Sequence, residues 1–237
     1  MIDFKDLPQD KIYFQDDDVV IYCADCRDIL PKIPKVDLVL TDPPYGVDYD
    51  GGSINEFKRE KLAGDSDANL YNEVLPLIYN AMRDGASGYV FYATSCEHEV
   101  YPIINKLFSY QQLVWWKRNA TFGSPFARYH FDYEPFIYIR KGSPSVWNGG
   151  TKERAVWNFK KSDEMLHPTQ KPIDIIQKMI FNSSDAGDLV LDSFMGSGTT
   201  LFAAKKLGRK CIGIEISEKY CEIAKNRLSQ SVMKFDI

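Results

Sequence analysis

The residues best suited to chemistry are Asp42, Pro43, Pro44 and Tyr45, which directly follow the apolar run 36–40. Such a run is typical of a buried strand, so the four residues form a rigid turn at a strand's carboxyl end. Each proline fixes its own φ and lacks a backbone N–H, which leaves the Asp42 carboxylate and the Pro43 carbonyl as acceptors. These acceptors suit an exocyclic amino group, and the Tyr45 ring can stack on the heterocycle that carries it. An ordinary proline-rich turn is the alternative.

A second candidate site is the stretch 189–200, in which a short apolar run leads into a glycine-bearing turn and a helix start. Gly196 and Gly198 permit unusual φ values and close approach of a ligand, while the helix N-terminus offers free N–H groups. The stretch lacks the third glycine of a nicotinamide-binding fingerprint and the Gly-Lys-Ser/Thr of a P-loop. Glu215 follows the run 211–214, and its separation in sequence from the glycine-bearing turn is about that at which an acid binds a ribose diol. These features predict an adenosine-containing cofactor; for Glu215 the alternative is a helix-start residue.

The elements that must position these residues alternate between two kinds. Seven apolar runs predict strands, at 19–23, 36–40, 89–93, 113–116, 135–139, 189–191 and 211–214. Segments with helical spacing lie between several of them, at 69–83, 96–107, 172–181, 199–207 and 217–228. The alternation predicts an α/β fold with a doubly wound, mostly parallel, seven-stranded sheet. Parallel strands end at one edge of such a sheet, where four acids are therefore expected: Asp25, Asp42, Asp192 and Glu215. For Asp25, a cap on the following helix is the alternative.

Length and composition indicate one core. With 237 residues and 44% hydrophobic content, the chain is predicted to form a single domain over residues 1–237. The net charge of -4 does not by itself indicate nucleic-acid binding, yet residues 105–171 carry eleven Lys or Arg against five Asp or Glu. A basic central segment in an otherwise acidic chain is typical of a protein that binds phosphates on one face, although a solvated charged surface explains this distribution equally well.

The sequence also predicts compartment and metal content. No apolar run approaches the roughly 20 residues that cross a bilayer, and residues 1–10 lack the layout of a secretory signal, so a cytoplasmic protein without membrane contact is expected. Five scattered cysteines suit reduced thiols. Cys23 and Cys26 form a C-x-x-C pair, but no second pair or histidine cluster follows, so no metal site is predicted.

Two stretches interrupt the alternation. Residues 46–67 are polar, bear glycines and follow the double-proline turn, which is typical of a mobile loop over a site or of a plain surface loop. Residues 141–166 place Trp147, Trp157 and Phe159 among basic residues. Aromatic rings interleaved with cations can stack on bases and neutralise phosphates, or they can form a satellite core. Contact with nucleic acid is favoured because the other motifs point to it.

Five short motifs follow one another along the chain: Ala-Asp-Cys at 24–26, Thr-Asp-Pro-Pro-Tyr-Gly at 41–46, His-Pro-Thr-Gln-Lys-Pro at 167–172, Asp-Ser-Phe-Met-Gly-Ser-Gly-Thr-Thr at 192–200 and Gly-Ile-Glu at 213–215. Their order resembles that of the β-class DNA amino-methyltransferases and spans nearly the whole chain. In that permuted family, the catalytic half precedes the cofactor half of a Rossmann-like fold. A small recognition insertion separates the halves, as residues 141–166 do here.

The resemblance implies S-adenosylmethionine as cofactor, held by the stretch 192–200, with Glu215 on the ribose hydroxyls and Asp25 near the adenine. The cofactor-binding residues implied in this way are Asp25, Cys26, Asp42, Thr169, Lys171, Asp192, Phe194, Gly196, Ser197, Gly198, Thr199, Thr200 and Glu215. Ser193 stands where the family usually has proline, which predicts a looser cofactor turn.

The resemblance further implies that Asp42, Pro43, Pro44 and Tyr45 act on a base flipped out of duplex DNA. In this family an aspartate at the start of the motif goes more often with adenine N6 and a serine with cytosine N4, so adenine is the predicted target. Additional candidates to line the pocket are Glu134, Trp116 and Phe122.

Three other functions stay open at this stage. They are cytosine-N4 methylation, methylation of RNA or of an amide side chain, and service as an inactive nucleic-acid-binding partner of another methyltransferase. Because a short recognition segment contacts few base edges, a short or degenerate target or help from a second subunit is expected. A homodimer is consistent with the resemblance.

Overall fold

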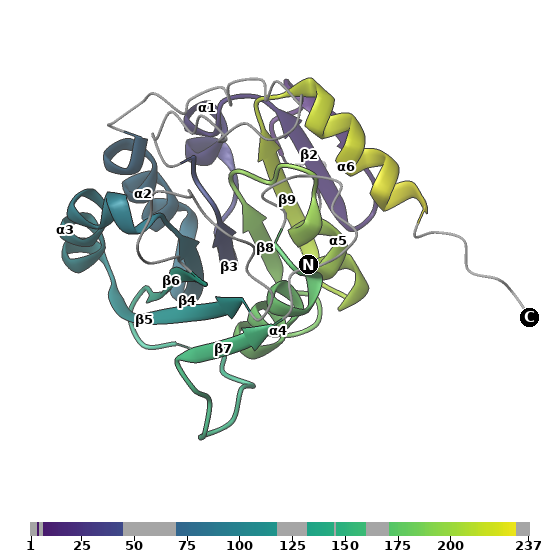
Figure 1. The fold of residues 1–237 in the computed structure, drawn as a ribbon. Helices are drawn as coiled ribbons and strands as arrows, with labels where there is room; N and C mark the ends of the chain where they lie inside the picture. Colours follow the sequence, from purple (N-terminus) through teal and green to yellow (C-terminus); the bar gives the residue numbers. More distant parts are fainter. Residues whose placement is uncertain are drawn as a thin grey trace, which may run out of the picture.

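The computed structural model describes residue 4 and residues 7–44, 70–117, 132–144, 146–159 and 171–230. These residues form one nine-stranded sheet with the order β1-β2-β9-β8-β3-β4-β6-β5-β7 (Figure 1). The strands are β1 (Ile12–Gln15), β2 (Val19–Cys23), β3 (Val36–Thr41), β4 (Met82–Phe91), β5 (Ser109–Lys117), β6 (Tyr133–Arg140), β7 (Val156–Phe159), β8 (Leu189–Asp192) and β9 (Lys210–Glu215). The helices are α1 (Cys26–Ile29), η2 (Leu30–Lys32), α2 (Leu70–Ala81), η3 (Thr94–Cys96), α3 (Glu97–Leu107), α4 (Ile173–Ser183), α5 (Thr199–Lys206) and α6 (Glu218–Gln230).

The sheet is mostly parallel. Strands β2, β9, β8, β3 and β4 run parallel to one another, β6 runs antiparallel to β4 and to β5, and β7 runs parallel to β5. All seven predicted strands are present, and the α/β fold class is confirmed. The count of seven is corrected to nine, because β1 and β7 add four residues each at the two ends of the sheet. Both are short and partly exposed edge strands, with apolar runs of three residues in β1 and two in β7.

Helices cover both faces of the sheet (Figure 1). Side chains alternate along each strand, so Val20 and Tyr22 of β2 join one core with α1, α2 and α3, while Val19 and Ile21 join the other with α4, α5 and α6. Strands buried on both faces are continuously apolar, which is why these strands could be found in the sequence. Within the described ranges, no helix combines the length and apolar character needed to cross a membrane.

The element boundaries differ from the predicted ones at a few places. Residues 82 and 83, expected at the end of a helix, belong to β4, which begins directly after α2 and ends at Phe91. Pro172 caps α4 rather than forming its first turn. Proline has no N–H to donate, so both positions suit it equally well, and sequence alone does not separate them.

One edge of the sheet gathers the residues of interest. Because β2, β9, β8 and β3 are parallel neighbours, the segments that follow them lie side by side at their carboxyl ends, here called the carboxyl edge. Strand β6 is antiparallel to β4, so its first residues reach the same edge, and Glu134 there pairs in register with Trp115 of β5. The topology therefore brings chain segments about 100 residues apart to one place.

Candidate active site

Four acids line the carboxyl edge in the order of the strands that carry them. Asp25 follows β2, Glu215 ends β9, Asp192 ends β8 and Asp42 follows β3. The alternation of strands and helices predicted this arrangement. Two of the four belong to the stretch 192–215 at the predicted cofactor site, and Asp42 belongs to the double-proline turn.

The glycine turn after β8 is built for a close approach. Gly196 and Gly198 have φ values of +50° and +76°, which only glycine adopts readily. A Cβ on Gly198 would come within 2.7 Å of Ala224 Cβ, whereas a Cβ on Gly196 would meet nothing within 4 Å. Gly198 is thus required by packing against α6, and Gly196 leaves backbone open to a ligand. Helix α5 then starts at Thr199, with its first N–H groups at the turn.

Asp192 is a buried carboxyl beside this turn. Its side chain accepts hydrogen bonds from the Phe194 backbone N–H, at 3.1 Å, and from the Thr200 hydroxyl. Burial raises the pKa of Asp192 to about 7, and the nearby Asp42 and Glu215 carboxylates add to the rise. Among the described residues, the groups that shift the pKa of Asp192 include no Lys or Arg. A cationic ligand would therefore stabilise the ionised form of Asp192.

Glu215 ties β9 to the glycine turn. Its Oε2 accepts the Gly196 N–H at 3.1 Å and its Oε1 accepts the Ser217 N–H at 2.9 Å. Burial raises the pKa of Glu215 above its usual value, although these backbone N–H groups oppose the rise. The carboxylate accepts the Ser217 N–H directly before α6 begins. Each carboxylate oxygen can still accept a second hydrogen bond.

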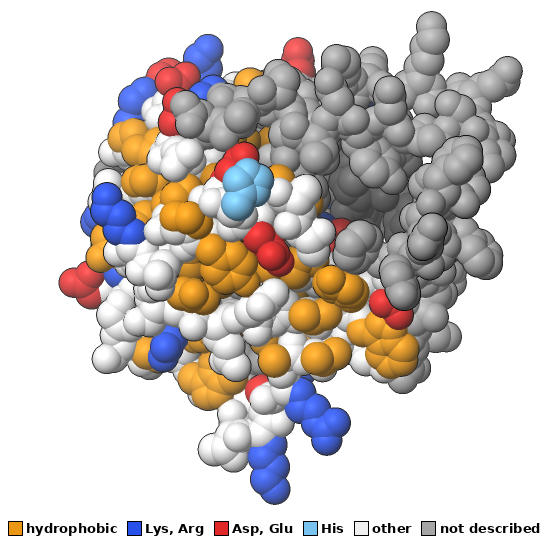
Figure 2. Space-filling view, turned by 60° about the vertical axis from the view of Figure 1, so that its left-hand side comes forward, with side chains coloured by type: hydrophobic (Ala, Val, Ile, Leu, Met, Phe, Trp, Pro, Cys, Tyr) orange, Lys and Arg blue, Asp and Glu red, His pale blue; other side chains and the backbone are white. Residues whose placement is uncertain are grey.

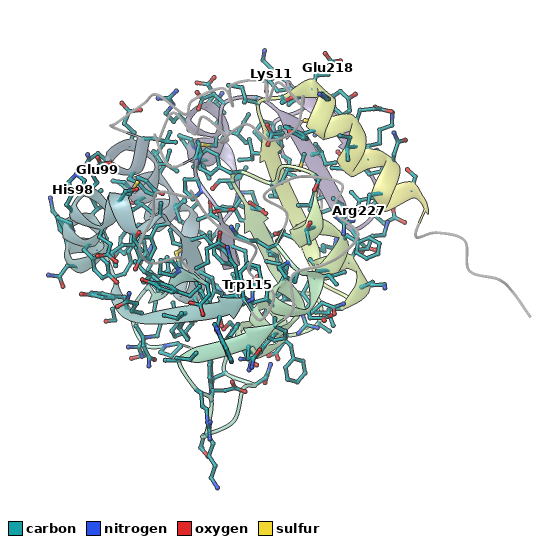
Figure 3. The ribbon with its side chains drawn as sticks, in the orientation of Figure 1. Lys11, His98, Glu99, Trp115, Glu218 and Arg227 are labelled. Carbon is teal, nitrogen blue, oxygen red and sulfur yellow. The ribbon has the colours of Figure 1, made fainter. Side chains whose placement is uncertain are left out.

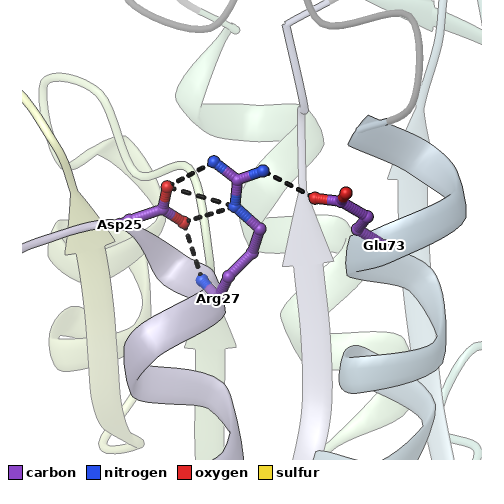
Figure 4. Close-up of polar contacts among 3 residues, drawn as sticks. All are labelled: Asp25, Arg27 and Glu73. Carbon is purple, nitrogen blue, oxygen red and sulfur yellow. Dashed lines mark hydrogen bonds and ion pairs between the residues drawn. The ribbon is translucent and has the colours of Figure 1, made fainter.

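Asp25 caps helix α1, which is the alternative given for it in the sequence analysis. Its side chain accepts the Arg27 backbone N–H at 2.9 Å and pairs with the Arg27 guanidinium, with Arg27 Nη2 2.6 Å from Oδ2 (Figure 4). The hydrogen bonds from Arg27 lower the pKa of Asp25. Arg27 also reaches Glu73 of α2 at 2.6 Å, which links α1 to α2. Asp25 is therefore held ionised at the end of β2.

The remaining predicted cofactor residues are mostly buried. Ser197, Thr199 and Thr200 are at most 8% exposed, so each offers little surface to a ligand. Arg227, which is labelled in Figure 3, belongs to α6. The Thr199 hydroxyl accepts a hydrogen bond from Arg227 Nη1 at 3.0 Å. Burial raises the pKa of the Cys26 thiol to about 12, so this thiol is not a nucleophile at neutral pH. All five cysteines are free.

Asp42 lies in an ion-pair cluster that the sequence did not predict. Lys171 Nζ lies 2.9 Å from Asp42 Oδ2 and 3.3 Å from Glu134 Oε2, and Lys117 Nζ lies 3.3 Å from Glu134 Oε1. The Lys171 ammonium also sits 4.6 Å from the centre of the Phe91 ring. Burial alone would lower the pKa of Lys171, but Asp42 and Glu134 outweigh it and raise the value. Burial alone would raise the pKa of Glu134, but Lys171 and Lys117 lower it.

A hydrogen bond joins the two candidate sites. Thr41 Oγ1 at the end of β3 and Ser193 Oγ after β8 lie 2.8 Å apart, and both side chains are buried. Ser193 is the residue expected to loosen the cofactor turn. It instead fastens that turn to the residue preceding Asp42, because its hydroxyl has a buried partner on the neighbouring strand.

Several predicted residues lie outside the described part of the chain. They are Tyr45 and Thr169, the loop 46–67 and Phe122. Pro43 is buried and Pro44 half-buried, beside Asp42.

The described part of the predicted recognition segment, 141–144 and 146–159, starts where β6 ends, at the sheet edge opposite Asp42. Trp157 is 4% exposed and packs edge-on against Phe136, with ring centres 5.2 Å apart, so its ring belongs to the core. Lys152 and Arg154 are exposed. Figure 2 shows Lys and Arg side chains at the lower end of the molecule, where this loop projects in Figure 1.

Comparison with known proteins identifies the family. A family model described as "DNA methylase" matches residues 36–226, most of the chain. The chain therefore belongs to the DNA methylase family, and the family predicted from the five motifs is confirmed.

Individual relatives agree with this assignment. The Type II methyltransferase M.HpaI of Haemophilus parainfluenzae is 28% identical over 91% of this chain and 76% of its own length. The DNA adenine methyltransferase YhdJ of Escherichia coli (strain K12) is 29% identical over 84% of this chain and 79% of its own length.

Solved structures share the fold. The M1.HpyAVI-SAM complex has a TM-score of 0.70 and 26% identity, covering 89% of this chain and 99% of that chain. The cytosine-N4-specific PvuII DNA methyltransferase has a TM-score of 0.77 at 17% identity, covering 97% of this chain and 91% of that chain, which shows the fold alone. The predicted Rossmann-like fold is confirmed.

Proposed function

We propose that this DNA methylase transfers a methyl group from S-adenosylmethionine to the exocyclic N6 amino group of an adenine in DNA. One observation carries the proposal: the double-proline turn and the glycine turn follow neighbouring parallel strands, β3 and β8. The hydrogen bond between Thr41 and Ser193 links the two turns directly. Neighbouring strands are about 4.8 Å apart, so a group held by one turn lies within reach of a group held by the other.

The glycine turn fits S-adenosylmethionine by three features of the structure. The space beside the Gly196 Cα is open, and the half-buried Glu215 carboxylate suits a ribose diol. A bound cation would stabilise the ionised form of the Asp192 carboxyl. When bound, this cofactor supplies an electrophilic methyl group on a positively charged sulfur. The residues proposed to hold it are Asp25, Cys26, Thr169, Asp192, Phe194, Gly196, Ser197, Gly198, Thr199, Thr200 and Glu215. Asp42 and Lys171, which the resemblance also implied for the cofactor, pair with each other and are proposed to serve the acceptor instead.

The double-proline turn is proposed to orient the acceptor. An aromatic amine is a poor nucleophile because its lone pair is delocalised into the ring. The Asp42 carboxylate and the Pro43 carbonyl accept its two N–H groups and favour a pyramidal nitrogen, whose lone pair is no longer delocalised into the ring. Positive charge develops on this nitrogen as the nitrogen–carbon bond forms and the sulfur–carbon bond breaks, and the fixed carboxylate stabilises that charge. The sulfur would leave as a neutral thioether, and the methylated nitrogen would then release one proton to solvent. Pro44 keeps the turn rigid, and Tyr45 stacks on the base.

Adenine is proposed as the target for two reasons. The motif opens with Asp42, and relatives at 27–29% identity include a protein named DNA adenine methyltransferase and Type II methyltransferases. We further propose that the base is flipped out of duplex DNA and that exposed cations of the segment 141–166 contact phosphates. We also propose that the enzyme works in the cytoplasm and can form a homodimer.

The test is product analysis. The purified protein is incubated with S-adenosylmethionine and unmethylated bacterial genomic DNA, and the DNA is digested to nucleosides for mass spectrometry. N6-methyladenine without N4-methylcytosine is expected. N4-methylcytosine alone would overturn the choice of adenine, and no methylated nucleoside in any DNA or RNA tested would support an inactive partner subunit instead.

A further inference from the structure

The Lys171 side chain is a buried cation that bridges two strands. Its side chain is 9% exposed, and its ammonium lies between Asp42, after β3, and Glu134, at the start of β6. Strand β4 separates β3 from β6 in the sheet, so the two carboxylates belong to strands about 10 Å apart. Lys171 fills the gap from above, over the ring of Phe91, the last residue of β4.

We propose that Lys171 and Glu134 are positioning residues for the acceptor carboxylate of Asp42, and that Glu134 acts on Asp42 only through Lys171. This inference rests on the proposed function, because it concerns the carboxylate that orients the target amine. It assigns Lys171 to the acceptor side of the site.

Burial makes the position of Lys171 strongly determined. A buried ammonium must stay close to its counter-charges, since leaving it unpaired costs several kcal/mol. Asp42 and Glu134 supply those charges from two sides, and the Phe91 ring supplies a third contact from below. The ammonium can therefore serve as a fixed point for the Asp42 carboxylate.

Glu134 completes the balance of charge. Its two oxygens are divided between Lys171 on one side and Lys117 on the other. Among the described residues of this cluster, two cations thus face two carboxylates, and such pairing is the condition under which buried charges are tolerated. Removing the charge of Glu134 leaves Lys171 with Asp42 as its one carboxylate in this cluster and lets the ammonium shift.

The consequence for catalysis is orientation. The Asp42 carboxyl can rotate about its Cβ–Cγ bond, and the contact between Lys171 and Oδ2 restricts that rotation. A carboxylate has about four acceptor sites, so it can bind Lys171 and an amino group together. A misplacement of about 1 Å in such a group can cost about a hundredfold in rate.

The experiment measures single-turnover methyl transfer with labelled S-adenosylmethionine and unmethylated genomic DNA. Glu134→Gln and Lys171→Met are each expected to slow transfer at least about tenfold, with the dissociation constant of S-adenosylmethionine changed less than about twofold. The double variant is expected to be no slower than Lys171→Met. Multiplying effects in the double variant would overturn the claim that Glu134 acts through Lys171.

Two variants, one of them new, separate positioning from folding. Lys171→Arg keeps the cation and is expected to recover at least about half of the rate lost in Lys171→Met, on a logarithmic scale. A Lys171→Arg variant as slow as Lys171→Met would overturn the role of the charge. Glu134→Gln keeps the shape of the side chain, so it carries the test if Lys171→Met does not fold.

Lys178 provides the matched control. It lies on α4, 2.7 Å from Glu153 and 4.6 Å from the centre of the Trp157 ring, so it makes the same kinds of contact away from Asp42. Lys178→Met is expected to transfer methyl at the parent rate, and an equal slowing would overturn the inference. A parent protein that transfers no methyl group refutes the proposed function. An active parent with an equally active Glu134→Gln variant refutes the positioning role alone.

Discussion

Lowering the pH from about 8 to about 6 is expected to weaken binding of S-adenosylmethionine about tenfold, through Asp192. Burial raises the pKa of this carboxyl to about 7, so it titrates near neutral pH. The proposed site has the ionised carboxylate bind a cationic part of the cofactor, so protonation of Asp192 competes with the ligand.

The magnitude follows from this pKa. A group with a pKa of about 7 is about one-eleventh ionised at pH 6 and about ten-elevenths ionised at pH 8. The affinity therefore changes by about a factor of ten, or about 1.4 kcal/mol. Asp192→Asn removes the titration, so the ratio of parent to variant affinity isolates it from any ionisation of the cofactor itself.

The same carboxyl has the opposite effect on the stability of the unliganded protein. Its folded-state pKa lies above the ordinary value of 3.8, so the folded state holds a proton that the unfolded state has lost between about pH 4 and pH 7. The contribution of this group to the free energy of unfolding is therefore lost as the pH rises through that window. Compared with the parent protein, Asp192→Asn is expected to be more stable at about pH 8 than at about pH 4.

Isothermal titration calorimetry at several pH values measures the affinity, and urea titration of the unliganded protein measures the stability. A parent-to-variant affinity ratio that stays constant from about pH 6 to about pH 8 would refute the assignment of Asp192 to a cationic group of the cofactor. A stability difference between parent and variant that does not depend on pH would refute the raised pKa itself.

Three further predictions concern the remaining groups of the site. Asp42→Ala is expected to slow methyl transfer at least about a hundredfold and to leave cofactor affinity nearly unchanged, because Asp42 acts on the target amine; equal losses of labelled transfer and calorimetric affinity would contradict this role. Glu215→Ala is expected to weaken cofactor affinity at least about tenfold, through lost hydrogen bonds to a charged group, and an unchanged affinity by fluorescence titration would remove Glu215 from the site. Ser193→Ala is expected to lower the free energy of unfolding by about 1 to 3 kcal/mol, because it leaves the buried Thr41 hydroxyl without this partner. In urea titrations the loss should be much smaller in a Thr41→Val background, and an equal loss there would show that the hydrogen bond does not matter.

Much of the fold could be predicted because buried parallel strands are continuously apolar. The runs at β2, β3, β8 and β9 are long enough to recognise, and their shared direction places the acids that follow them at one edge. Strands β1 and β7 are four residues long and lie at the two ends of the sheet, where a short strand leaves little pattern in the sequence.

The ion-pair cluster could not be predicted from sequence. Lys171 meets Asp42 and Glu134 only after the chain folds. In the sequence it lies 129 positions after Asp42 and 37 positions after Glu134, and no regular spacing relates residues so far apart. A basic residue in a Pro-Thr-Gln-Lys-Pro motif before a helix is as consistent with a surface cation as with a buried one. The partner of Ser193 is equally remote, 152 positions away in the sequence, so its hydroxyl could be interpreted only as a departure from the family pattern.

A crystal structure of the protein with bound S-adenosylmethionine tests the central claim most directly, because the claim is that donor and acceptor sites converge. The methyl carbon is expected within about 5 Å of the Asp42 carboxylate or the Pro43 carbonyl, the distance set by a hydrogen bond to the amine and an in-line attack by it. A cofactor whose methyl group points away from both oxygens, or which binds outside the glycine turn at Gly196, would contradict it.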